Sequence, residues 1–200
     1  MGNRLILASI SPRRHEFLKK LGLDFDVIPS RVEEDFVDDE LPEEHVLRLA
    51  EAKALDVARE HPDQWVIAAD TIVCVHGSTL GKPKSREEAL EMLQRLSGRE
   101  HQVLTGFSVH HWKKKKGGRQ SVRTEVRVKT LAAAEMQWYV NTGEPFDKAG
   151  AYAIQGIGSF MIESIHGSYT NVVGLPVCEL LQMLERLGAI TISERGMRIS

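Results

Sequence analysis

Leu5-Ile6-Leu7-Ala8-Ser9-Ile10-Ser11-Pro12-Arg13-Arg14 is the stretch that decides the fold, because it predicts a buried strand that runs directly into a helix. Its apolar first half, followed by turn-forming residues, is typical of a core strand. Ser11 is a suitable N-cap, Pro12 suits the first helical position, and Gly22 can end the helix.

This helix start predicts a phosphate site. Free N–H groups, the hydroxyls of Ser9 and Ser11 and the guanidinium groups of Arg13 and Arg14 would converge beyond the carboxyl end of the strand. An ordinary capped helix with solvated arginines explains the same residues, and this stretch alone leaves both interpretations open.

Composition indicates one globular domain that can have two lobes, since 200 residues with 42% hydrophobic side chains can bury a sizeable core. A formal net charge of -2 gives no global reason to expect nucleic acid or a membrane surface as a partner. Cys74 and Cys178 lie in apolar stretches and predict buried thiols in a reducing compartment. We find no signal-peptide pattern and no apolar run of membrane-spanning length, so we expect a cytoplasmic protein.

An acidic loop is predicted from Pro29 to Leu41, after a short strand at Asp24 to Ile28. It contains Glu33-Glu34-Asp35. Such a run is usually a solvated surface, but one carboxylate can instead bind a divalent cation, because Mg²⁺ prefers oxygen ligands.

A lysine interrupts the apolar face of the clearest helix, predicted over Glu43 to Glu60. Lys53 lies on the same stripe as Val46, Leu49, Ala50 and Val57. Either its ammonium extends out to water, or it points into a cleft that holds anions.

Asp70 is the most informative anomaly, because it stands at the centre of the apolar strand predicted from Trp65 to Val75. Aspartate is rare in strands and is almost never buried without a partner. Asp70 therefore needs a cation, a set of hydrogen-bond donors or a metal nearby, unless a bulge brings it to the surface.

The middle of the chain predicts a hairpin turn at His76-Gly77-Ser78 and a helix opened by a capping box of Ser85 and Glu88. Lys82 stands between Gly81 and Pro83, on a stiff backbone that suits a phosphate oxygen or a plain turn. Strands are expected at residues 101–111 and 121–129, joined by a hairpin tip that contains Lys113 to Lys116. A solvated tip is favoured there over a nucleic-acid patch.

The last third predicts a short helix at residues 131–140, a strand at 160–165, a turn at 167–171 and a final helix that ends at Gly188. Residues 191–200 show no pattern and are expected to be a loose tail.

Five motifs, in this order, resemble the Maf family of nucleotide pyrophosphatases over residues 5 to 187. They are Leu7-Ala8-Ser9 with Ser11-Pro12-Arg13-Arg14, Ala69-Asp70-Thr71, Gly81-Lys82-Pro83, Asp147-Lys148-Ala149-Gly150-Ala151-Tyr152 through Gln155-Gly156, and Gly174-Leu175-Pro176. The resemblance implies an α/β fold in which a long bent mixed β-sheet is flanked by helices, as one domain of residues 1–190 with two lobes and an active-site cleft between them. It also implies hydrolysis of a nucleoside triphosphate to the monophosphate and pyrophosphate, with Mg²⁺ or Mn²⁺, as a step that clears the nucleotide pool.

The family members that prefer dTTP and UTP resemble this chain at Asp70-Thr71 and at Gln155, whereas members acting on 7-methyl-GTP differ at both places. The resemblance, with the chemistry of phosphate transfer, assigns Asp70 to catalysis and, with Glu33, to the metal. Ser9, Ser11, Arg14, Lys53 and Lys82 would bind phosphates, and Arg13, Thr71 and Gln155 would select the base.

Two alternatives remain at this level. One is a 7-methyl-GTP pyrophosphatase, and the other is a non-enzymatic regulator of septum formation, after which the family is named. The sequence also leaves a homodimer open.

Overall fold

The computed structural model describes residues 4–37, 39–194 and 196–200. A seven-stranded mixed sheet has the strand order β2-β1-β3-β5-β6-β7, with β4 paired to β3. Its strands are β1 (Leu5–Leu7), β2 (Phe25–Val27), β3 (Val66–Val75), β4 (Ser78–Leu80), β5 (Glu100–His111), β6 (Lys116–Val128) and β7 (Ile162–His166). β1 pairs in parallel with β2 and β3, and the β3–β4 and β6–β7 pairs are antiparallel.

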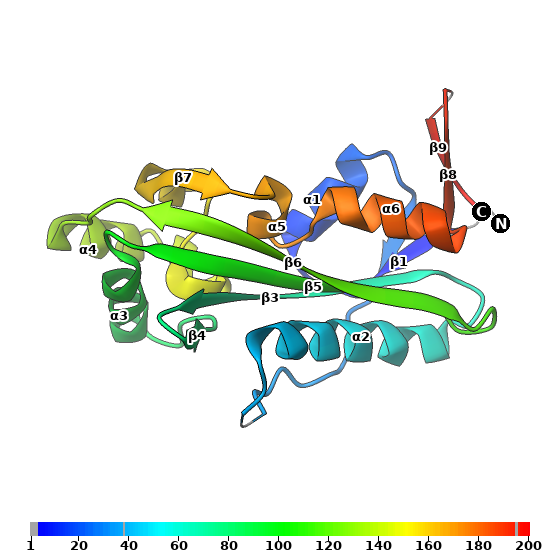
Figure 1. Cartoon of the computed structure of the whole chain (residues 1–200), viewed down its shortest axis with the longest axis horizontal. Helices are drawn as coiled ribbons and strands as arrows, with labels where there is room; N and C mark the ends of the chain where they lie inside the picture. The colour runs from blue at the N-terminus through cyan, green and yellow to red at the C-terminus, as the bar shows by residue number, and fades with distance from the viewer. Residues whose placement is uncertain (1–3, 38, 195) are drawn as a thin grey trace. The chain divides into compact units, whose positions relative to one another are not determined.

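Helices and strands alternate along most of the chain (Figure 1). They are α1 (Pro12–Lys20), α2 (Pro42–Glu60), α3 (Arg86–Leu96), α4 (Ala133–Asn141), α5 (Tyr169–Val173) and α6 (Val177–Leu187), with 3-10 turns η1 (Glu144–Asp147), η2 (Ala149–Ala151) and η3 (Gly156–Met161). A separate hairpin joins β8 (Ile190–Ser193) and β9 (Gly196–Ile199).

The chain divides into two compact units. The first contains the residues up to Asp70, Thr105 to Ser121 and the segment from Gly174 onward. Within it, α2 covers one face of the strands, and α1 and α6 cover the other (Figure 1). A Cβ on Gly106 would lie 2.3 Å from the carbonyl oxygen of Val46, so only glycine lets β5 pack this closely against α2.

The second unit contains Thr71 to Leu104 and Val122 to Val173. Its core includes fully buried side chains of α3, β6 and α4, among them Leu93, Val126 and Tyr139. Asn171 is buried and its amide donates to the carbonyl oxygen of Val103 at 3.1 Å and to Thr124 Oγ1 at 2.9 Å. These bonds satisfy polar groups inside an apolar core, which is necessary because an unpaired buried amide destabilises the fold.

The predicted α/β class with a mixed sheet flanked by helices is confirmed, as are the strand and helix at the N-terminus, the long helix at α2 and the strand around Asp70. Along the described residues, no helix is long and apolar enough to cross a membrane.

Several local predictions were wrong. The tip after β5 is shorter than expected, because β6 already begins at Lys116, and the predicted turn at residues 167–171 contains the start of α5. Residues 191–200 are not a loose tail in the part described, since the β8–β9 ladder pairs Ile190 with Ile199. Cys178 is exposed rather than buried, because it lies in the first turn of α6, away from the apolar stripe of that helix.

Candidate active site

A strand runs into helix α1 as predicted, but Ser11 and Ser9 make different hydrogen bonds from those that a serine N-cap would make. Ser11 stands at the N-cap with an extended backbone and makes no capping bond through its side chain. Its N–H donates instead to Ser9 Oγ at 3.2 Å. Ser9 therefore orders the turn between β1 and α1, and α1 begins with Pro12 as predicted.

Arg14 ties three segments of the first unit together. Its Nε donates to the carbonyl oxygen of Gly174 at 2.7 Å, and its Nη1 donates to Ser9 Oγ at 3.1 Å and to the carbonyl oxygen of Ala69 at 2.8 Å. Burial lowers the pKa of Arg14, and the nearby charges of Asp70 and Glu34 act in the opposite direction. A guanidinium remains charged under such conditions, so Arg14 places positive charge beside Asp70.

Lys53 and Asp70 form a buried ion pair, which resolves both anomalies of the sequence. Lys53 Nζ lies 2.6 Å from Asp70 Oδ1, and the two residues are only 5% and 7% exposed. Lys53 does not extend to water. Asp70 lies buried within β3, and no bulge brings it to the surface. Two charges are removed from water here at a considerable desolvation cost, which is compensated only by their mutual attraction and further hydrogen bonds.

A second carboxylate reaches the same ammonium, and it belongs to Glu34 rather than to the predicted Glu33. Glu34 Oε1 lies 2.6 Å from Lys53 Nζ, although Glu34, like Glu33, is an exposed residue. The acidic loop has no periodicity from which the sequence could indicate which carboxylate reaches Lys53. The structure thus brings Glu34 to the pair, and the predicted metal role of Glu33 stays a prediction.

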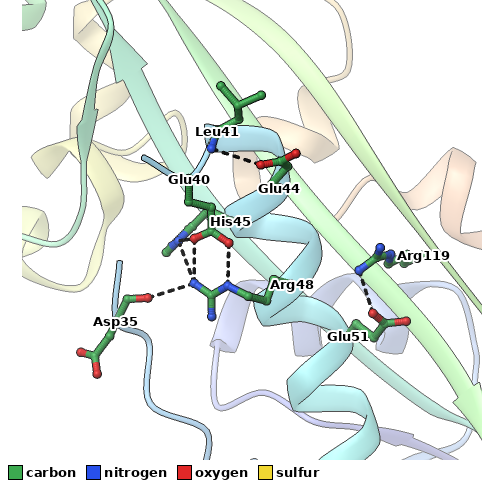
Figure 2. Close-up of polar contacts among 8 residues, drawn as sticks. All are labelled: Asp35, Glu40, Leu41, Glu44, His45, Arg48, Glu51 and Arg119. Atoms are coloured by element: carbon green, nitrogen blue, oxygen red, sulfur yellow. Dashed lines mark hydrogen bonds and ion pairs between the residues drawn. The ribbon is translucent and has the colours of Figure 1, made fainter. Parts of the chain in front are cut away.

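The loop that carries Glu34 is fixed to α2 by a cluster of polar groups, shown in Figure 2. Arg48 donates to both carboxylate oxygens of Glu40, at 2.6 and 2.8 Å, and to the carbonyl oxygen of Asp35 at 3.1 Å. His45 lies 2.9 Å from Glu40 and its ring stacks on that of Phe36.

The other end of the loop is also fastened to α2, because the N–H of Arg31 donates to Asp56 at 2.9 Å. Glu34 thus lies between two anchored positions. The sequence analysis did not identify Glu40, His45 and Arg48. The available signal was a histidine and an arginine three residues apart on one helix, beside an acidic loop with which they could pair.

Arg13 lies in the first turn of α1, in the first unit, whereas Thr71, Lys82 and Gln155 belong to the second unit. There the backbone joins two of the motifs, because the N–H of Gly150 donates to the carbonyl oxygen of Gly81 at 2.9 Å. Gly150 has φ +72° and packs against Val73, so a side chain at this position would be strained and crowded. The segment of Lys82 is thereby attached to β3.

Gln155 lies on a segment that Glu144 and Tyr139 hold in place. Glu144 accepts hydrogen bonds from the N–H groups of Ile157 at 2.9 Å and Gly158 at 3.2 Å. The hydroxyl of Tyr139 accepts from the N–H of Ala153 at 3.1 Å, and burial raises the pKa of this hydroxyl, which therefore stays protonated. Both ends of the segment containing Gln155 are fixed.

The donor set of the first unit fits a hard divalent cation only in part. Asp70 and Glu34 each place a carboxylate oxygen 2.6 Å from Lys53 Nζ, so the ammonium already occupies the position that the two carboxylates share. Mg²⁺ commonly takes one or two such ligands together with phosphate oxygens. Among the described residues, no group of three or more His, Cys, Asp or Glu side chains is arranged to hold a metal ion. A cation here would therefore depend on oxygens of the substrate.

Comparison with known proteins first shows the fold class. The Staphylococcus aureus Ham1 protein has a similar structure, with a TM-score of 0.50 and 18% sequence identity over 92% of this chain and 99% of that chain. At that identity the likeness concerns the mixed α/β fold alone.

The family follows from sequence. The model of the family described as "Maf-like protein" matches residues 4–187, and this chain belongs to the Maf family. A relative from Syntrophus aciditrophicus, named dTTP/UTP pyrophosphatase, is 52% identical over 95% of this chain and 93% of its own length. A relative from Geotalea uraniireducens with the same name is 50% identical over 94% of this chain and 97% of its own length. The predicted family is confirmed.

Proposed function

We propose that this chain hydrolyses dTTP and UTP between the α and β phosphates, releasing the nucleoside monophosphate and pyrophosphate. The observation that carries the proposal is the buried pair of Lys53 and Asp70 with Glu34 beside it, in a chain whose relatives at about 50% identity are named dTTP/UTP pyrophosphatase. Clearing of the nucleotide pool in the cytoplasm is the cellular role consistent with this reaction.

Hydrolysis at this bond requires a water held in line with the leaving group and cations on the phosphate oxygens. Asp70 is the base or metal ligand of the proposal, because a carboxylate can accept the proton of the attacking water. Lys53, already beside Asp70, is suited to meet a phosphate oxygen when substrate enters. Ser9, Ser11, Arg14 and Lys82 are proposed as further phosphate ligands.

The proposed cofactor is Mg²⁺ or Mn²⁺, held by Asp70 and Glu34 together with the substrate. Such a cation would neutralise charge that develops on the phosphate oxygens. The residues of this chain would then orient the triphosphate, exclude bulk water and accept the proton from the attacking water.

Base selection is assigned to Gln155, Arg13 and Thr71. The imide edge of uracil or thymine presents an acceptor, a donor and an acceptor in sequence. A glutamine amide can accept from the ring N–H and donate to a carbonyl oxygen, while arginine and threonine add donors. Cytosine lacks that ring N–H and carries an amino group in place of one carbonyl, so CTP should be a poor substrate.

The test is a product assay with purified protein, Mg²⁺ or Mn²⁺, and a panel of normal, modified and 7-methylated nucleoside triphosphates. We expect turnover of UTP and dTTP, release of pyrophosphate, and loss of activity when EDTA is added. Release of orthophosphate would place the cut at the β–γ bond and contradict the proposal. If 7-methyl-GTP is the best substrate, the assignment of Thr71 and Gln155 is wrong, and if no nucleotide is turned over, the regulatory alternative becomes the better hypothesis.

A further inference from the structure

The first unit contains a cavity of about 510 Å³ between α2 and the β5–β6 hairpin. None of the candidate active-site residues lines it. Its walls include Leu55, His110, Trp112, Lys115, Lys116 and Gly117. This volume lies within the range of small-molecule sites, roughly 300–1,000 Å³, and is far larger than an inorganic ion requires.

The walls of the cavity are partly apolar. Leu55 contributes an aliphatic side chain from α2, and Trp112 contributes an indole ring that is 45% exposed. The backbone of Gly117 lies against the ring of His110, because a Cβ there would be 2.3 Å from Nδ1. Only glycine allows this approach, so at this position the wall presents backbone and ring surface rather than a side chain. Such a surface suits a planar ring.

The charge along the cavity is positive, and it comes from two of the four consecutive lysines. Lys113 is 2.7 Å from Asp63, and Lys114 lies over the ring of Trp65 at 5.5 Å. Lys115 and Lys116 line the cavity, and no acidic side chain of the described residues pairs with either.

The nearest carboxylate of the cavity is already engaged. Glu51 pairs with Arg119 at 2.7 Å, an ion pair between α2 and β6 that Figure 2 shows. The charge of Glu51 is thus balanced within the protein. The ammonium groups of Lys115 and Lys116 remain available to an anion.

His110 adds no charge to the cavity. Burial lowers the pKa of His110, so the imidazole is neutral near pH 7. Its Nε2 is buried and has no hydrogen-bond partner among the described residues, since Glu51 Oε1 is 3.7 Å away.

We propose that this cavity binds a flat ring that carries an anionic group. The ring would lie against Trp112, Leu55 and the Gly117 backbone, and the anion would meet Lys115 and Lys116. Two kinds of molecule share this chemistry, a nucleoside monophosphate and an aromatic acid without phosphate. The proposal does not depend on the proposed enzymatic activity, because it uses none of the active-site residues.

Binding can be followed with the full chain through the indole N–H signals in ¹H–¹⁵N spectra, assigned by replacing Trp65, Trp112 and Trp138 in turn with phenylalanine. The probe is 1-naphthalenesulfonate, and its uncharged counterpart is 1-naphthalenemethanol. We expect the sulfonate to shift the Trp112 signal and leave Trp138 unchanged. The uncharged compound should bind at least about tenfold more weakly, because it lacks the anion.

A matched pair of double variants isolates the two cavity lysines. Lys115→Ser/Lys116→Ser should raise the Kd of the sulfonate at least about tenfold, because it removes both ammonium groups at the cavity. Lys113→Ser/Lys114→Ser removes the same total charge from the same hairpin and should change the Kd by no more than about twofold. Equal losses in the two double variants, an unmoved Trp112 signal, or equal binding of the uncharged compound would overturn the proposal.

Two further titrations identify the source of the ligand. Displacement of the sulfonate by dTMP, with the same dependence on Lys115 and Lys116, would support a nucleoside monophosphate. Retention of the sulfonate in the presence of dTMP would support an aromatic acid. A thymidine oligonucleotide that binds more tightly than either small probe, and is lost in the Lys115→Ser/Lys116→Ser variant, would replace the proposal with a nucleic-acid site.

Discussion

The ammonium of Lys53 lies 2.6 Å from the carboxylate of Asp70, and both side chains are removed from water although they are 17 residues apart in the chain. The pair is therefore held by the packing of α2 against β3, not by local sequence. Breaking such a pair from one side leaves an uncompensated buried charge, which is costlier than removing both charges.

Asp70→Asn keeps the shape of the side chain and removes its charge. We expect turnover of dTTP to fall on the order of a hundredfold or more, because the base or metal ligand is lost. Pyrophosphate release measures the activity, and circular dichroism shows whether the fold is intact. A folded variant with nearly normal turnover would leave Asp70 only a structural role.

A double-mutant cycle measures how strongly Lys53 and Asp70 are coupled in the stability of the fold. Lys53→Met should lower the free energy of unfolding by about 3–5 kcal/mol, because buried Asp70 loses the ammonium that bonds to it directly. Adding Asp70→Asn to Lys53→Met should restore about 1–3 kcal/mol of that loss, since the uncompensated charge is gone. Urea denaturation of the four proteins gives the coupling energy. Strictly additive effects would contradict direct pairing in solution.

Glu34 and its neighbour Glu33 form a matched pair for testing which of the two carboxylates acts in the site. Glu34→Gln should reduce turnover at least about tenfold, because it removes a carboxylate from the Lys53–Asp70 pair and from the proposed metal. Glu33→Gln removes the same charge from the neighbouring position of the same loop, and because Lys53 pairs with Glu34 and not with Glu33, it should leave turnover within about twofold. The measurement is kcat and KM for dTTP over a range of Mn²⁺ concentrations. The reverse order of effects would support the predicted role of Glu33 and contradict the role of Glu34.

The hydrogen bonds of Glu40 predict that the stability of the fold decreases at acidic pH. The hydrogen bond from Arg48 lowers the pKa of Glu40 to about 2, from an ordinary value of 4.5. Since the folded-state pKa is depressed, this contribution to stability is complete above about pH 4.5 and is lost as the pH falls toward 2.

The measurement is thermal unfolding of the wild type and of Glu40→Gln at several pH values. The variant should be less stable than the wild type at pH 7, and the difference should shrink as the pH falls from 4.5 toward 2. An exposed control is Glu44→Gln, because Glu44 makes only a long hydrogen bond, 3.4 Å, to the N–H of Leu41. A difference that stays constant with pH would show that Glu40 does not titrate as inferred.

Gln155→Glu should blunt the preference for UTP and dTTP over CTP, because a carboxylate cannot donate to a base carbonyl. The loss for the preferred substrates should correspond to about 1–3 kcal/mol in transition-state binding. The ratio of kcat/KM for UTP and CTP in the two proteins measures it. An unchanged ratio would remove Gln155 from base selection.

The sequence by itself determined the elements with regular spacing. The strand and helix at the N-terminus, the long helix with Lys53 on its apolar stripe and the apolar strand with Asp70 at its centre all follow from local periodicity and capping residues. The family motifs likewise lie within short stretches. These features were predictable because each depends on neighbours in the chain, and each violation of a pattern marked a residue that needed a partner.

The tertiary structure alone decided which partners meet. That Lys53 bonds to Asp70, that Glu34 rather than Glu33 pairs with Lys53, and that Arg48 fastens the acidic loop to α2 depend on segments far apart in sequence. A loop has no repeating backbone geometry, so its sequence does not say which side chain faces the protein. The cavity beside Lys115 and Lys116 could not be predicted for the same reason. The four consecutive lysines are the same residue type, and only the packing of α2 against the hairpin distinguishes the two that line the cavity from the other two.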